Sequence, residues 1–234
     1  SIGESQVAEE IQDLIEKQTN PTIAPYAKTG EVHLRITAKG KNEKECQKLI
    51  KPVVKELKAR FGRNVFATEE SKTLEEAVVD MLKEQEMTLS LAESCTGGAI
   101  AARIVNVSGA SEVFLQGMVT YSNKAKRRCL DVSKSTLKKH GAVSEECAAE
   151  MAKGGRKAAE TDICLSVTGI AGPGGGTKEK PVGTVFMGCS YKGCTKVREF
   201  HFQGNRARVR EQTVAHGLAF LRDCMMERAD KKNK

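Results

Sequence analysis

The hydrophobic positions of the first 70 residues follow two different periods. Apolar residues recur at helical spacing from Val7 to Ile15, whereas the segment EVHLRITA alternates apolar and polar residues as a half-buried strand does. The pattern predicts a helix over 4–17, a strand over 31–38, a helix over 43–60 and a short strand over 64–67. Pro21 and Pro25 predict an irregular break before the first strand. Residues 1–70 are therefore expected to form a small α/β unit, which would be marginally stable alone.

The rest of the chain alternates between helical and strand-like patterns. Helices are expected over 73–86, 99–107, 133–140 and 145–159 and from 206 onward, and strands over 87–92, 114–121, 163–168, 183–191 and 195–202. Ser144 and Asn205 stand where they would cap the helices that follow them. Lys192 and Gly193 fit the turn of a late hairpin. The fold class expected is α/β, a layered mixed sheet flanked by helices over 73–228, with a charged tail at 229–234.

Composition narrows the class of protein. Hydrophobic residues make up 39% of the chain, no apolar run is long enough to span a membrane, and the amphipathic, acidic N-terminus is unlike a signal peptide. Eight cysteines are scattered without the spacing of a metal site, as expected for free thiols in a reducing cytoplasm. We therefore expect a cytoplasmic protein that has no membrane partner and no metal.

The charge is uneven along the chain. The first 80 residues carry 13 Lys or Arg and 14 Asp or Glu, whereas the remainder carries 25 and 16, a balance of +9. A basic domain favours an anionic partner such as a phosphate-bearing small molecule or nucleic acid. Aromatic residues are only 4% and Trp is absent, so a stacking surface for single-stranded nucleic acid is not expected.

The first candidate for chemistry is the loop AESCTGG, which follows a predicted strand and precedes a predicted helix. Ser94 could act there as a nucleophile, and the amides of Thr96, Gly97 and Gly98 could bind a developing oxyanion. The alternative is that Ser94 or Thr96 only caps the helix.

The second candidate is the segment VTYSNKAKRR, in which Lys124 and Lys126 lie close to Tyr121. A buried lysine with a lowered pKa can replace histidine as the base for a serine. The alternative is a solvated basic turn.

The third candidate is the glycine-rich stretch that begins at Thr168 and Gly169, after a buried strand. Glycines allow a backbone to approach a ligand closely, although this stretch matches neither phosphate-loop motif. A flexible connection is the alternative. Arg206, at the start of the last helix, could bind a phosphate or carboxylate, or could simply be a surface arginine.

Taken together, the motifs resemble a known family. AESCTGG, VTYSNKAK, HGAVS, TGIAGPGGG, KPVGTV and FQGNR occur in the order found in the C-terminal domain of the competence/damage-inducible CinA family. The likeness covers about 73–228, and residues 1–70 resemble the KH-like middle region of longer members. The molybdopterin-binding-like domain that precedes this region in such members is not in the sequence, so we expect a fragment of a longer protein, and pyrophosphatase activity is not carried over.

The resemblance implies a hydrolase that acts on a carboxamide C–N bond. Members of the family convert nicotinamide mononucleotide into nicotinate mononucleotide and ammonia, without a cofactor, in bacterial pyridine nucleotide (NAD) salvage. It implies that Ser94 is the nucleophile, Lys126 the base and Tyr121 a catalytic neighbour. Polar positions of the family's site fall on Ser111, Thr168 and Arg206.

Two alternatives stay open beside this nicotinamide-nucleotide amidase. A nucleic-acid-binding accessory protein of competence would fit the basic charge, but the first unit lacks a G-x-x-G loop, so nucleic acid is not the partner we expect. An inactive regulatory module would not need Ser94, Tyr121 and Lys126. A homo-oligomer is neither required nor excluded by the sequence.

Overall fold

The computed structural model describes residues 4–29, 31–69 and 72–232. The chain divides into two compact units, Ser1–Lys72 and Thr73–Lys234. Among the described helices, none combines the length and the apolar character that crossing a membrane requires.

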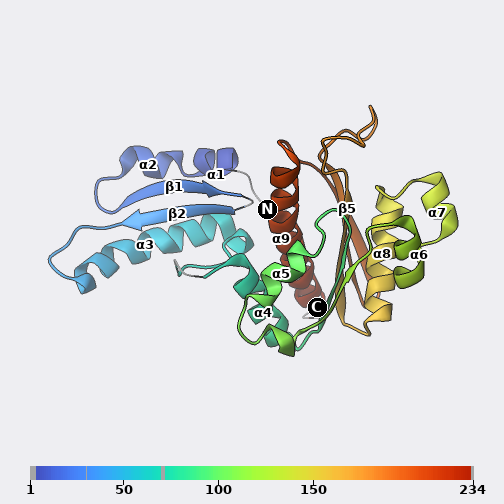
Figure 1. The fold of residues 1–234 in the computed structure, drawn as a ribbon. Coiled ribbons are helices and arrows are strands. Elements are labelled where there is room, and N and C mark those ends of the chain that lie inside the picture. Colours follow the sequence, from blue (N-terminus) through green and yellow to red (C-terminus); the bar gives the residue numbers. More distant parts are fainter. Residues whose placement is uncertain (1–3, 30, 70–71, 233–234) are drawn as a thin grey trace. The chain divides into compact units, whose positions relative to one another are not determined.

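The first unit packs three helices against a two-stranded antiparallel sheet (Figure 1). Its elements are α1 (Glu4–Glu10), α2 (Gln12–Lys17), β1 (Thr22–Lys28), β2 (Glu31–Thr37), α3 (Glu43–Phe61) and a 3-10 turn, η1 (Gly62–Asn64). The core residues come from α1, the turn after it, β1 and α3: Val7, Ile11, Ile23, Leu57 and Phe61. The helical and alternating patterns of this segment thus place their apolar faces in one small core.

Two expectations for the first unit are wrong. Pro25 does not extend the break but lies inside β1, opposite Leu34. Proline is tolerated there because β1 pairs on one side only, so the missing N–H interrupts no second ladder. Residues 64–67 form no strand, because neither described strand extends to pair with them. Val65 packs instead against the small core.

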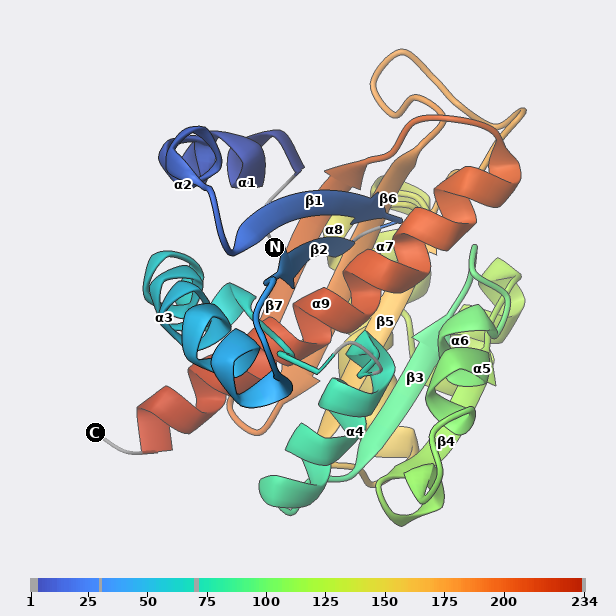
Figure 2. The same ribbon diagram turned by 90° about the vertical axis from the view of Figure 1, so that its left-hand side faces the viewer.

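The second unit is a three-layer α/β domain with a five-stranded mixed sheet (Figures 1 and 2). Its elements are α4 (Leu74–Glu84), β3 (Leu89–Glu93), α5 (Ala99–Val105), the 3-10 turn η2 (Ala110–Glu112), β4 (Phe114–Val119), α6 (Asn123–Leu130), α7 (Lys134–Lys139), α8 (Glu145–Ala158), β5 (Ile163–Gly169), β6 (Thr184–Tyr191), β7 (Cys194–His201) and α9 (Arg206–Lys232). The strand order is β4-β3-β5-β6-β7; β4, β3 and β5 are parallel, and the β5–β6 and β6–β7 pairs are antiparallel. The expected mixed sheet flanked by helices is confirmed.

The sheet is covered on both faces. Helices α4, α5 and α9 lie on one side and α6, α7 and α8 on the other (Figure 1). Strands β3 and β6 are buried along their whole length, and their polar side chains, such as Ser90 and Ser190, are buried with them. Strand β4, at one edge, is largely exposed.

The structure confirms the expected helix caps and adds one helix. Ser144 accepts a hydrogen bond from the amide of Cys147, and Asn205 accepts one from the amide of Arg208. Helix α6 was not expected, because its sequence NKAKRRCL resembles a solvated basic turn. It forms because Ser122 caps it and because Leu130 enters the core beneath α8.

Several loops begin or end at one end of the sheet, which is called an edge of the sheet below. The carboxyl ends of the parallel strands β3, β4 and β5 meet there, and the start of β6 and the end of β7 lie beside them because these strands run antiparallel to their neighbours. Ligands of open α/β sheets bind outside the carboxyl ends of the strands. The three candidate loops and the start of α9 therefore converge at this edge.

Candidate active site

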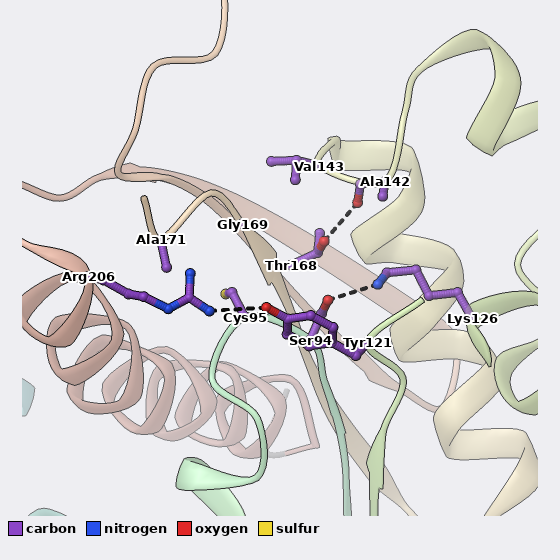
Figure 3. A pocket seen from close by; sticks show the side chains of 10 residues that line it. All are labelled: Ser94, Cys95, Tyr121, Lys126, Ala142, Val143, Thr168, Gly169, Ala171 and Arg206. Atoms are coloured by element: carbon purple, nitrogen blue, oxygen red, sulfur yellow. Dashed lines mark hydrogen bonds between the residues drawn. The ribbon is translucent and has the colours of Figure 1, made fainter. Parts of the chain in front are cut away.

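A cavity of about 180 Å³ opens at this edge of the sheet (Figure 3). Residues from all the converging loops line it: Ser94, Cys95, Tyr121, Lys126, Ala142, Val143, Thr168, Gly169, Ala171 and Arg206. Six of the residues proposed from the sequence are brought together here: Ser94, Tyr121, Lys126, Thr168, Gly169 and Arg206. No carboxylate is among the lining residues.

Ser94 begins a tight turn between β3 and α5. Its amide donates to the carbonyl of Val167 on β5, so the residue is held as an extension of the sheet. The turn then requires two residues with positive φ, and these are Gly97 at 64° and Gly98 at 92°. Glycine adopts such angles without the steric penalty of a Cβ. The two glycines thus allow the chain to reverse immediately behind the serine.

Lys126 reaches Ser94 from the opposite side of the pocket. Its Nζ atom lies 2.8 Å from Ser94 Oγ (Figure 3). The same atom donates to the carbonyl of Thr120 at 2.8 Å. The lysine is only 1% exposed, and it is among the largest of the fully buried side chains in the described part of the chain. A lysine buried to this degree without a carboxylate beside it is rare.

Burial lowers the pKa of Lys126 from its ordinary value, because the charged ammonium loses its hydration. Cys147 and Cys95 lie near enough to raise that pKa, but only as thiolates. Burial raises the pKa of each thiol to about 11, so both stay protonated near neutral pH. The lysine is therefore biased toward the neutral amine, which can accept a proton from Ser94.

Arg206 bridges two sides of the pocket mouth. Its Nη1 donates to the carbonyl of Gly172 at 2.8 Å, and its Nη2 donates to the hydroxyl of Tyr121 at 3.0 Å. Tyr121 is 63% exposed. A guanidinium has five N–H donors, so Arg206 keeps donors that these two bonds do not use.

The turn before α8 forms the remaining wall. Thr168 Oγ1 donates to the carbonyl of Ala142 at 2.7 Å, and Lys180 Nζ donates to the carbonyls of His140 and Val143. Lys180 belongs to the glycine-rich loop, which is thereby tied to this turn. Ala142 and Val143 were not singled out from the sequence, although they lie within the motif HGAVS.

Two expectations about the site are not met. The amides of Gly97 and Gly98 are not available to an oxyanion, because the Gly97 amide donates to the carbonyl of Ser94 and the buried carboxylate of Glu93 accepts from Gly98, Ile100 and Ala101 at 2.8–3.2 Å. Neither Gly97, Gly98 nor Thr96 lines the cavity. Glu93 stood in the motif AESCTGG, but no spacing could show that its side chain folds back onto the helix.

Ser111 lies at the opposite edge of the sheet from the cavity. It is part of η2, which precedes the amino end of β4, and Phe114 at that end pairs with Leu89 at the start of β3. Ser94 follows the other end of β3, about 16 Å away at roughly 3.3 Å per residue. In the described parts of the chain, no three His, Cys, Asp or Glu side chains are placed to hold a metal ion.

Comparison with known proteins shows which family has this sequence and architecture. The family model for the CinA C-terminal domain matches residues 71–225, and the model for the damage-inducible protein CinA KH domain matches residues 1–67. The chain belongs to the CinA family. The resemblance found in the loop motifs is thereby confirmed.

Relatives and solved structures agree. A CinA-like protein of Kosmotoga olearia is 49% identical over 225 residues, which are 96% of this chain and 54% of that protein. A protein of Clostridium novyi (strain NT), named as competence-damage inducible, is 53% identical over 94% of this chain and 53% of its own. The chain thus spans about half the length of the curated relatives it matches.

The competence/damage inducible protein CihA of Agrobacterium tumefaciens has a crystal structure that covers 63% of this chain and 91% of its own, with a TM-score of 0.62 and 39% identity. A CinA superfamily protein of Klebsiella pneumoniae covers 66% of this chain and 96% of its own, with a TM-score of 0.64 and 35% identity.

Proposed function

We propose that this CinA-family chain is a nicotinamide-nucleotide amidase, which hydrolyses nicotinamide mononucleotide to nicotinate mononucleotide and ammonia. The observation that carries the proposal is the 2.8 Å separation of Ser94 Oγ and Lys126 Nζ, with the lysine buried and its pKa lowered. Such a pair forms a nucleophile and its base without histidine or metal. The choice of nicotinamide mononucleotide as the substrate comes from the family's activity, which the loop motifs imply.

The first half of the reaction would form an acyl-enzyme. Ser94 Oγ attacks the carboxamide carbon while its proton passes to the neutral amine of Lys126. Lys126, now an ammonium, donates a proton to the departing nitrogen, which leaves as ammonia. The burial that lowers its pKa also makes this ammonium a stronger acid than a solvated lysine.

The second half would release nicotinate mononucleotide. Lys126 accepts a proton from a water molecule, which attacks the ester carbon, and Ser94 leaves with the proton that Lys126 returns. The carbonyl of Thr120 holds Nζ throughout by its hydrogen bond and keeps the amine directed at the serine. One water is consumed and one ammonia is produced in each cycle.

Arg206 suits the phosphate of the substrate. Its guanidinium lies at the mouth of the cavity, is exposed and retains unused donors beside those bound to Gly172 and Tyr121. Phosphate recognition by arginine relies on such charge-assisted, bidentate hydrogen bonds. The carboxamide would then lie deeper, beside Ser94, and the phosphate would lie outside.

The decisive experiment is to incubate the chain with nicotinamide mononucleotide and to measure ammonia and nicotinate mononucleotide together. Equal amounts of the two products support the proposal, and Ser94→Ala serves as the control for contaminating activity. The absence of both products with the wild-type chain, or equal rates in the two proteins, would reject it.

A further inference from the structure

Arg210 lies one helical turn after Arg206 on α9, and it contacts the turn that carries Ser94. Its Nε donates to the carbonyl of Cys95 at 3.1 Å, and its Nη2 donates to the carbonyl of Thr96 at 2.7 Å. In the described part of the second unit, no carboxylate pairs with this guanidinium. Arg210 is half-buried and donates to two successive carbonyls. These two hydrogen bonds fix the orientation of the peptide groups to which the carbonyls belong.

Because peptide groups are planar, fixing a carbonyl also fixes the direction of the N–H in the same peptide group, and this effect extends to the pocket. In a trans peptide the carbonyl and the following N–H point in opposite directions. By holding the carbonyl of Thr96, Arg210 therefore directs the N–H of Gly97, which donates to the carbonyl of Ser94 at 3.1 Å. That carbonyl in turn sets the direction of the N–H of Cys95, and Cys95 is one of the residues that line the cavity.

Glu93 holds the other end of the same turn. Its carboxylate accepts from the amides of Gly98, Ile100 and Ala101, and the amide of Ala99 donates to the carbonyl of Thr96. In the described structure, only the amides of Cys95 and Thr96 in this turn donate to no other residue. An oxyanion formed on attack by Ser94 needs donors of this kind.

We infer that Arg210 is a positioning residue that directs the amide of Cys95, beside Ser94, toward the oxyanion of the reaction. Glu93 supports the same turn from the helix end. This inference rests on the proposed function. It gives Arg210 a different role from Arg206, because Arg210 contacts the peptide groups of the catalytic turn instead of lining the cavity.

The test compares Arg210→Ala and Arg210→Lys with Arg208→Ala, which removes the same charge from an exposed position on α9. We expect kcat for nicotinamide mononucleotide to fall about 10- to 100-fold in Arg210→Ala, because losing a donor to an oxyanion costs up to about 10³-fold. KM should change less than about twofold, since the amide acts mainly in the transition state. Added guanidinium should restore part of the rate in Arg210→Ala but should leave Arg208→Ala unchanged.

A second readout needs no turnover. The backbone amide resonances of Cys95, Thr96 and Gly97 should move in Arg210→Ala and stay in place in Arg208→Ala. Wild-type kcat in Arg210→Ala, a change in KM alone, or an equal loss in Arg208→Ala would overturn the inference. The inference would also be overturned if Arg210→Ala had both a lower kcat, which guanidinium did not restore, and a lower melting temperature.

The two proposals can fail separately. If the wild-type chain releases no ammonia, the proposed function is rejected, and the amide resonances alone decide whether Arg210 holds the turn. Unmoved resonances would then overturn the inference, whereas displaced resonances would support only that Arg210 holds the turn.

Discussion

Ser94 Oγ and Lys126 Nζ lie 2.8 Å apart although 32 residues separate them in the chain. Parallel pairing of β3 with β4 places the two loop ends at the same edge of the sheet, and α6 then turns Lys126 back toward the serine. The contact therefore depends on the position of α6 as much as on the two residues.

Ser94→Ala is expected to lower kcat by about 10³-fold or more, because the nucleophile is removed. The melting temperature should stay close to that of the wild type, since the change deletes one hydroxyl and leaves the Thr120 carbonyl to hold Lys126. Ammonia release and thermal unfolding measure the two effects. Near-native turnover with reduced stability would show that Ser94 is only a structural residue of the turn.

Lys126→Arg should also be inactive, although the positive charge is kept. Arginine stays protonated throughout the working pH range and cannot accept the serine proton. In the wild type, the rate should rise with pH up to the pKa of Lys126, because only the neutral amine is a base. Since burial lowers that pKa, the midpoint of the rise should lie below the ordinary value of 10.5.

A pH profile of kcat/KM, which reports the free enzyme, measures this directly. Lys124→Ala is the matched control, because Lys124 is exposed on the same helix and does not line the cavity. It should keep the wild-type profile. Substantial activity in Lys126→Arg would remove the lysine from the role of base.

Arg206→Ala should weaken substrate binding more than bond cleavage. A charge-assisted contact to phosphate contributes roughly 1.5–3 kcal/mol, which corresponds to about a 10- to 150-fold increase in KM. The effect should nearly vanish with nicotinamide riboside, which lacks the phosphate. Steady-state kinetics with both substrates distinguish the outcomes. An equal loss on both, or a loss in kcat alone, would instead place Arg206 in catalysis through its bond to Tyr121.

Gly154→Ala should shift α6 and thereby the base. A Cβ at Gly154 would lie 1.8 Å from the carbonyl oxygen of Leu130, the last residue of α6. Relief of this clash requires α6 to move from α8, at a cost of about 1–3 kcal/mol in the free energy of unfolding. A displacement of about 1 Å at Lys126 can cost about 10²-fold in rate.

Thermal unfolding and ammonia release should both report this change, and Lys153→Ala, an exposed change on the same helix, should alter neither. Unchanged activity in a destabilised Gly154→Ala protein would mean that the lysine position does not depend on the contact between α6 and α8.

The sequence alone determined the layers of the second unit and the loops that carry the site. Continuous apolar runs predict buried strands such as β5, and Ser144 and Asn205 mark helix starts by a short-range interaction that needs no tertiary contact. Strand ends are likewise local features, so Ser94, Tyr121 and Thr168 could be selected before their distances were known. The loop motifs identified the family for the same reason.

Only the tertiary structure decided which of these groups meet and what surrounds them. Lys124 and Lys126 belong to one polar segment, and packing of α6 against α8 determines that Lys126 is the buried one. The carboxylate of Glu93 accepts hydrogen bonds from amides at the start of α5, and the local sequence does not show whether these amides bind Glu93 or a substrate. Ser111 lies at the far edge because α5 runs back along the sheet. Burial, and with it the lowered pKa of Lys126, depends on contacts between residues distant in sequence, and no spacing along one chain contains that information.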